Sequence, residues 1–124
     1  MTEPSSLGEL AERYIAVWNE SDTQARRSAV EQIWSKDALC CTAAADYVGR
    51  EAIEGRVAAA LEKWVQQQGF IFRARGAVDE HHGGMRVRWD MTPRAGGEPV
   101  SSGEQFLLVD DDGHVRYDYQ FMDT

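Results

Sequence analysis

The sequence has few of the residues that would cross-link it or attract it to nucleic acid. Only two of its 124 residues are cysteines, and because Cys40 and Cys41 are adjacent, a disulfide between them is sterically poor. Lys and Arg number 13 against 21 Asp and Glu, which gives a net charge of −8, and they form no basic run. Since nucleic acids and anionic membranes are bound through clustered Lys and Arg, we expect neither as a partner.

Long apolar runs are also lacking. No segment is long and apolar enough to span a bilayer, and residues 1–6 lack the basic and apolar regions of a signal peptide. We therefore expect a cytoplasmic protein. The chain shows no repeat, linker or low-complexity stretch, and 43% hydrophobic residues suffice for one core, so we expect a single domain over residues 1–124.

The first half of the chain has a helical pattern. Residues 6–9 and 21–24 each have the form of a capping box, and apolar residues then recur every three or four positions, to Trp18 or Asn19 in the first case and through Trp34 in the second. Residues 38–42 predict a short strand and a loop to Gly49. A third helix is expected from there to Gly69.

After Gly69 the apolar period changes from about 3.6 to 2. Four strands are predicted, at residues 70–78, 85–91, 104–109 and 114–122, separated by turns and loops at 82–84, 93–97 and 110–113. Three helices followed by consecutive strands indicate an α+β fold, with the N-terminal helices packed against one face of a curved antiparallel sheet.

This order of elements resembles the NTF2-like superfamily, specifically its SnoaL-like and ketosteroid-isomerase-like members. The residues that carry the resemblance are RYIAVWN at 13–19, WSKDA at 34–38, GREAI at 49–53 and GHVR at 113–116. The resemblance implies a cone with an apolar pocket, no cofactor, and a homodimer formed through the outer face of the sheet. It is specific for the fold and weak for function, because the superfamily contains isomerases, cyclases, hydrolases, dehydratases and binding proteins.

The resemblance to the isomerases places three residues at catalytic positions. Tyr14 matches a tyrosine that donates to a developing oxyanion, and the alternative is an ordinary core tyrosine. Glu104 aligns with an acid that is kept protonated to donate to the same oxygen, and the alternative is a solvated strand carboxylate. The general base matches Thr42, whose hydroxyl cannot act as a base at neutral pH, so steroid isomerisation is not expected unless Asp46 substitutes.

The last strand supplies the best acid/base candidate. By alternation Arg116, Asp118 and Gln120 share one face with Met122, and the opposite face carries Val115, Tyr117, Tyr119 and Phe121. The resemblance places the first set in the pocket. SnoaL-like cyclases carry an acid/base aspartate where this chain has Gln120, and Asp118 lies two residues earlier on the same face. In an apolar pocket its pKa would rise toward the working range, and the alternative is an ion pair of Asp118 with Arg116 or another strand arginine.

Aromatic side chains indicate a binding wall as well as a core. The expected substrate-binding residues are Trp18, Thr42, Phe72, Trp89, Met91, Arg116 and Gln120. For Trp34 and Trp64, core packing is favoured. No metal site is expected, because adjacent His81 and His82 point to opposite faces of a strand, and residues 110–113 lack the ligand spacing of a calcium loop.

Two functions follow from these residues. The first is a SnoaL-like, cofactor-independent enzyme that performs acid/base chemistry (cyclisation, isomerisation or hydration) on a small hydrophobic molecule with a carbonyl group. Asp118 would be its acid/base group, and Tyr14 and Glu104 would polarise an oxygen. The alternative is a non-catalytic binding or dimerisation module that holds a small apolar ligand, since Thr42 and Gln120 stand where the resembling enzymes carry acids.

Overall fold

A computed structural model of the chain describes residues 6–123, without the side chain of Ser6. The expected capping box at Ser6 therefore lies outside the described residues. The helices are α1 (Ser6–Val17), α2 (Thr23–Ile33) and α3 (Arg50–Ala60), which continues as the π-helical turn η1 (Leu61–Gln66). The strands are β1 (Trp34–Cys41), β2 (Asp46–Val48), β3 (Phe70–Ala74), β4 (Asp79–His81), β5 (Gly84–Pro93), β6 (Ser101–Val109) and β7 (Val115–Met122).

The strands form one mixed sheet in the order β2-β1-β7-β6-β5-β3, with β4 also paired to β5. Neighbours run antiparallel except β1 and β7, which are parallel. The prediction of a purely antiparallel sheet was wrong at this pair. Since α3 and several strands separate β1 from β7 along the chain, no hairpin forces the two strands to run in opposite directions.

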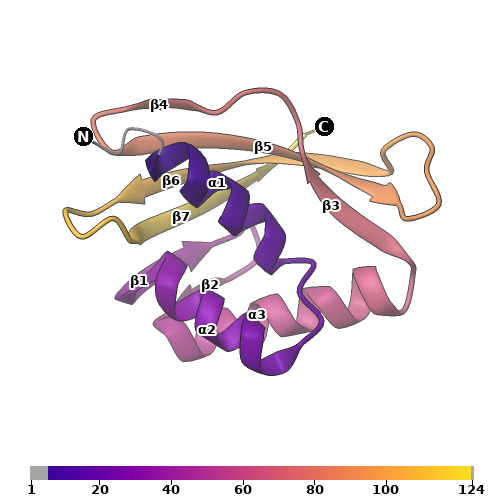
Figure 1. Ribbon diagram of the computed structural model, residues 1–124, viewed down its shortest axis with the longest axis horizontal. Helices are drawn as coiled ribbons and strands as arrows, with labels where there is room; N and C mark the ends of the chain where they lie inside the picture. Colours follow the sequence, from indigo (N-terminus) through magenta and orange to yellow (C-terminus); the bar gives the residue numbers. More distant parts are fainter. Residues whose placement is uncertain (1–5, 124) are drawn as a thin grey trace.

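The three helices cover one face of this curved sheet, as predicted. Figure 1 shows the long strands β5, β6 and β7 across the upper part of the view, with α1 crossing in front of the sheet and α2 and α3 below. The core lies between the two layers and contains the fully buried side chains of Leu10, Tyr14, Ile33, Trp34 and Ile53. Burial of these large apolar groups is the main favourable term holding the helices on the sheet.

The end of the second helix differs from the prediction. Asp22 caps the start of α2 by accepting a hydrogen bond of 2.8 Å from the backbone N–H of Ala25. Trp34 has extended backbone angles and begins β1, although the apolar spacing continued the helix through it. Ile33 and Trp34 are both completely buried, one at the end of the helix and the next at the start of the strand, so spacing alone could not locate the boundary.

A bulge changes which residues of β7 face the core. The register with β6 pairs Leu108 with Tyr117 but Val109 with Val115, so β7 has one extra residue at this point. Val115 is consequently buried in the core together with Asp118. The prediction that Val115 shares a face with Tyr117 was therefore wrong, whereas the alternation from residue 117 onward is as expected.

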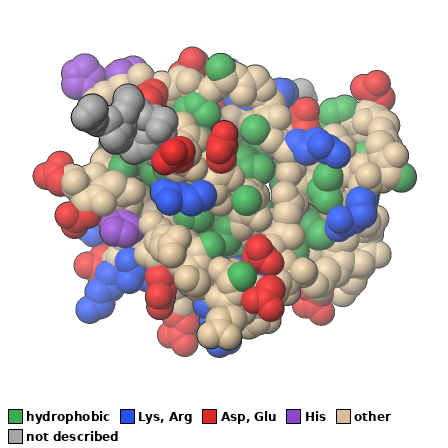
Figure 2. Space-filling model, in the orientation of Figure 1, with side chains coloured by type: hydrophobic (Ala, Val, Ile, Leu, Met, Phe, Trp, Pro, Cys, Tyr) green, Lys and Arg blue, Asp and Glu red, His purple; other side chains and the backbone are tan. Residues whose placement is uncertain are grey.

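Two smaller elements also differ from the prediction. The predicted strand at 70–78 is shorter in the structure, where β3 ends at Ala74 and a separate short strand, β4, follows at Asp79–His81. The expected loop before Gly49 contains the short strand β2. None of the helices within residues 6–123 is long and apolar enough to cross a membrane. Figure 2 shows acidic side chains spread over the visible face, with basic ones between them.

Candidate active site

A cavity of about 570 Å³ lies between the helices and the concave face of the sheet. Residues of α1, of α3 and η1, and of strands β3, β5, β6 and β7 line it. Its wall is mainly aromatic and aliphatic, with Trp18, Phe72, Trp89 and Met91 among the lining side chains. The volume and lining are those of a site for a small, largely apolar molecule.

Behind this wall lies a buried carboxylate that accepts three side-chain hydrogen bonds. The Tyr14 hydroxyl donates to Oδ2 of Asp118 over 2.8 Å, and Trp34 Nε1 donates to the same oxygen over 3.3 Å. Gln105 Nε2 donates to Oδ1 over 2.7 Å. Gln105 in turn accepts a hydrogen bond of 3.0 Å at Oε1 from Trp89 Nε1. Tyr14 and Gln105 line the cavity, so two wall residues are directly bonded to Asp118.

The donors and acceptors of this network allow one arrangement. An indole N–H can only donate, so the amide oxygen of Gln105 must face Trp89. The amide NH₂ group of Gln105 therefore faces Asp118 and donates to it. Trp34 likewise requires an acceptor. An ionised carboxylate satisfies all three donors at once, which explains an aspartate at a position with no exposed surface.

Burial shifts the ionisation of this pair. Desolvation raises the pKa of Asp118 above its ordinary value of 3.8, although the hydrogen bonds from Tyr14, Gln105 and Trp34 and the charge of Arg56 oppose the shift. Burial, and then the charge of Asp118, raise the pKa of Tyr14 well above 10.0. The shared proton therefore resides on Tyr14, and Asp118 is the group in the site whose pKa is moved toward neutrality.

Cys40 is the residue of β1 that faces this network. It pairs with Asp118 in the parallel ladder and is buried, and burial followed by the charge of Asp118 raises the pKa of its thiol. Cys40 is therefore a neutral thiol and a small buried neighbour of the carboxylate. Both cysteines are free.

Six of the residues expected in the site line the cavity: Tyr14, Trp18, Phe72, Trp89, Met91 and Gln120. Asp118 joins them through Tyr14 and Gln105 rather than lining the wall itself. The alternative for Asp118, an ion pair with Arg116 or another strand arginine, is not found among the described residues. The Arg116 guanidinium instead lies 5.5 Å from the ring centre of Tyr117.

Three expected placements were wrong. Glu104 lies on the outer face of β6, where it pairs with Arg88 at 3.4 Å and Arg86 at 4.0 Å. Thr42 follows β1 in a turn, and its hydroxyl accepts hydrogen bonds from the backbone N–H groups of residues 44 and 45. Arg116 does not line the cavity. Glu104 lies on the opposite face of β6 from Gln105, Thr42 lies beyond the end of β1, and Arg116 lies at the bulge in β7.

Sequence reasoning also missed Gln105 and Trp34, which complete the network. The signal for Gln105 was its place between Gly103 and Leu107, which are both buried on the inner face of β6. Gly103 faces Trp89 across the ladder, and a Cβ there would lie 2.5 Å from the indole Cζ2. The glycine therefore provides the space in which Trp89 lies to reach Gln105.

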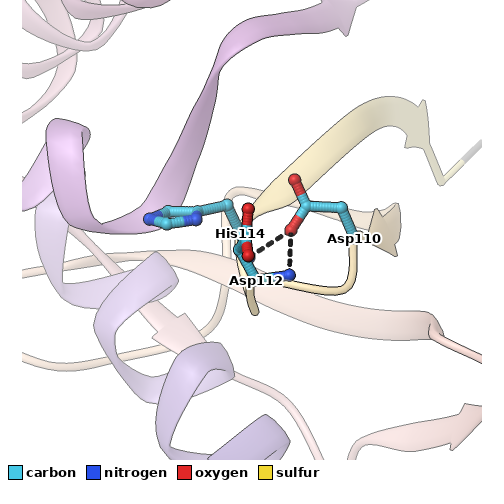
Figure 3. A group of neighbouring side chains, drawn as sticks. All are labelled: Asp110, Asp112 and His114. Atoms are coloured by element: carbon cyan, nitrogen blue, oxygen red, sulfur yellow. Dashed lines mark hydrogen bonds between the residues drawn. The ribbon is translucent and has the colours of Figure 1, made fainter.

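The turn between β6 and β7 brings three potential metal ligands together (Figure 3): Asp110, Asp112 and His114. Hydrogen bonding within the turn accounts for this group, because Asp110 Oδ1 accepts bonds of 3.0 Å from the backbone N–H groups of both Asp112 and His114. An aspartate that caps its own turn in this way is common in loops without a metal.

The fold is that of an NTF2-like protein, and solved structures confirm the resemblance expected from the sequence. A provisionally assigned isomerase of the SnoaL-like family from Agrobacterium tumefaciens superposes with a TM-score of 0.86 at 25% identity, over 97% of this chain and 99% of the other. A provisionally assigned polyketide cyclase from Sinorhizobium meliloti has a TM-score of 0.68 at 18% identity, over 93% and 97% of the two chains. An NTF2-like protein of unknown function from Exiguobacterium has a TM-score of 0.71 at 17% identity, over 92% and 98%.

Two further comparisons found no relative. No family model matches the sequence. No curated protein matches it either.

Proposed function

We propose that this protein is an enzyme that moves a proton on a small hydrophobic carbonyl compound without a cofactor. The observation that carries the proposal is the 2.8 Å hydrogen bond between Tyr14, in the cavity wall, and the fully buried carboxylate of Asp118 behind it. A basic carboxylate joined to the wall by one short bond can exchange protons with a ligand that it does not touch.

The proton balance of such a relay is simple. The C–H bond next to the substrate carbonyl breaks, its proton goes to the Tyr14 oxygen, and the phenolic proton moves to Oδ2 of Asp118. The electron pair stays on the substrate as an enolate. Asp118 becomes neutral as the enolate forms, so the number of buried negative charges does not change. Return of the proton to a different substrate atom completes an isomerisation, and attack of the enolate on a second carbonyl completes a cyclisation.

The surroundings of Asp118 suit this role. Burial raises its pKa, which makes the carboxylate a stronger base than a solvated aspartate. Gln105 and Trp34 hold the carboxylate while Tyr14 takes part in the transfer. The names of two of the structural neighbours, an isomerase and a polyketide cyclase, describe reactions of this class and support the proposal by analogy.

Exchange of hydrogen for deuterium at C2 of 1-tetralone, followed by NMR in D₂O, tests the proposal. We expect the protein to accelerate exchange over buffer, and Tyr14→Phe and Asp118→Asn to lose about 100-fold or more of that acceleration. Glu104→Gln, on the outer face of the sheet, is the matched control and should exchange at the wild-type rate. Exchange that is unaffected by Asp118→Asn would remove this residue from the mechanism.

A binding module remains the second candidate, because Asp118 has a full set of hydrogen bonds and does not line the cavity. In that case the network would only hold Tyr14, Gln105 and Trp89 in place around an apolar ligand. Quenching of tryptophan fluorescence by 1-tetralone without any acceleration of exchange would favour this function.

We also propose that the protein forms a homodimer through the outer face of the sheet. Phe106, Tyr119 and Phe121 lie on that face of β6 and β7 and are 40%, 39% and 57% exposed. Phe106 is directly opposite Tyr119 in the ladder, so the rings form one apolar area. Exposed apolar area of this kind, bordered by the ion pairs of Glu104, is typical of a protein interface.

A further inference from the structure

The cavity contains two polar donors that the protein itself leaves without acceptors. Trp18 is 8% exposed and lines the cavity, and its Nε1 is buried with no hydrogen-bond partner. Arg56 lines the same cavity, and its Nε is also buried and unpartnered. Buried donors without an acceptor cost free energy, so a pair of them in one cavity indicates a place where a ligand supplies the acceptor.

Arg56 carries a full positive charge that no carboxylate neutralises directly. No ion pair within 4.0 Å between described side chains includes it. The charge acts at a distance on Asp118, whose pKa it lowers against the larger effect of burial.

The guanidinium is also held in a fixed position. Its central carbon lies 5.3 Å from the ring centre of Trp18 and 5.3 Å from that of Tyr47. The two aromatic rings restrict the side chain through their faces, and the guanidinium is also within hydrogen-bonding reach of the Cys40 thiol, while its Nε has no partner. A planar, pre-positioned guanidinium is suited to bind a carboxylate by donating two parallel N–H···O hydrogen bonds.

We propose that the natural ligand of the cavity is a hydrophobic carboxylic acid, bound with its carboxylate at Arg56 and the Trp18 N–H and its apolar part against the remaining wall. This deepens the proposed function, because it rests on the same cavity and defines the substrate class. A single guanidinium balances one negative charge on the ligand, and the buried carboxylate of Asp118 disfavours a second negative charge on the ligand. A monoanionic carboxylate therefore fits better than a phosphate ester.

The orientation follows from the order of the side chains. The ring centres of Trp18 and Tyr14 are 6.0 Å apart, and Arg56 lies against Trp18. A carboxylate at Arg56 thus places the adjacent carbons of the ligand along Trp18, toward the Tyr14 hydroxyl. In this orientation the acid group binds, and a separate carbonyl further along the molecule meets the proton relay.

Isothermal titration calorimetry with two matched probes tests the proposal on the wild-type protein. Naphthalene-1-acetate and its neutral amide, naphthalene-1-acetamide, have nearly the same shape. At low salt we expect the acid to bind about tenfold or more tightly than the amide, and 1-naphthyl phosphate to bind more weakly than the acid. Equal affinity for the acid and the amide, or tighter binding of the phosphate, would overturn the proposal without requiring any variant.

Two variants assign the preference to its residues. Arg56→Gln should abolish the preference for the acid while leaving the affinity for the amide nearly unchanged, and Trp18→Phe should reduce the preference severalfold because the ring remains and only the N–H is lost. Arg88→Gln, on the outer face, is the control and should keep the wild-type preference. A preference for the acid that survives Arg56→Gln would refute the site.

The binding test and the test of proton transfer fail separately. Acid selectivity without deuterium exchange of 1-tetralone would leave the carboxylate site in place and remove the relay. Deuterium exchange that depends on Asp118, together with equal binding of the acid and the amide, would leave the relay in place and remove the carboxylate site.

Discussion

Replacing Gln105 with methionine tests the buried network most clearly. Methionine is unbranched and of similar size, so Gln105→Met removes hydrogen bonds with little change in packed volume. The side chain is 3% exposed, which means that water cannot replace the lost partners. The free energy of unfolding should therefore fall.

The magnitude follows from the two bonds that Gln105 makes. Trp89 Nε1 loses its acceptor, and a buried unsatisfied donor costs about 1–3 kcal/mol. Asp118 loses a charge-assisted hydrogen bond, which contributes about 1.5–3 kcal/mol. Greater apolar burial and partial reorientation of the Trp89 ring offset some of this, so we expect a net loss of roughly 2–4 kcal/mol.

Urea unfolding followed by tryptophan fluorescence measures this loss, and Gln120→Met is the matched control. Gln120 lines the same cavity, and no hydrogen bond of its side chain is found among the described residues, so the same substitution there should leave the stability close to wild type. If Gln105→Met and Gln120→Met were equally stable, the network around Asp118 would not hold the fold as we infer.

Three further predictions concern pH, packing and assembly. Burial raises the native pKa of Asp118 above its unfolded value of 3.8, so its contribution to stability is greatest at low pH and is lost as pH rises through the native pKa. The wild-type protein should therefore gain stability relative to Asp118→Asn as the pH falls through the native pKa of Asp118. Urea unfolding at a series of pH values measures this difference. Gly103→Ala should destabilise the protein by about 1–3 kcal/mol in thermal unfolding because the new methyl displaces Trp89. Gly55→Ala, in open space on a helix, is the control and should stabilise the protein by about 0.5–1 kcal/mol. Equal effects of the two substitutions would contradict the close packing of Trp89 against Gly103. Light scattering should give twice the chain mass of 13.9 kDa, and Phe121→Ser should shift the protein toward monomer; a wild-type monomer would refute the dimer.

The helices and long strands could be predicted because their apolar periods are unambiguous. α1 and β5 carry repeated apolar residues at spacings of three to four and of two, and both lie where the pattern indicated. The parallel pairing of β1 with β7 leaves no local trace in the sequence, since it depends on how distant segments meet. The bulge at residues 115–117 is equally invisible, because one additional residue does not interrupt the apolar pattern.

The sequence singled out Tyr14 and Asp118, which are hydrogen-bonded in the structure, but it did not single out Gln105 and Trp34 as partners of Asp118. Tyr14 and Asp118 are 104 positions apart in the chain, and the resemblance to SnoaL-like proteins was the reason to consider them together. Glu104 was considered because the resemblance aligns it with the protonated acid of the isomerases, but in a strand a shift of one residue reverses the face, and Gln105 is the residue on the inner face. Trp34 was correctly expected in the core, yet its N–H donates to Asp118, which apolar spacing cannot reveal.

The central claim is that the carboxylate next to Tyr14 accepts the proton, and moving that carboxylate by one residue tests it most directly. In Asp118→Asn/Gln105→Glu every donor can remain paired: the asparagine oxygen faces Tyr14 and Trp34, its amide donates to the new glutamate, and the glutamate accepts from Trp89. Deuterium exchange of 1-tetralone is the measurement. A folded double variant that binds the ketone but does not accelerate exchange is the predicted result, and a double variant that exchanges at the wild-type rate would contradict the account.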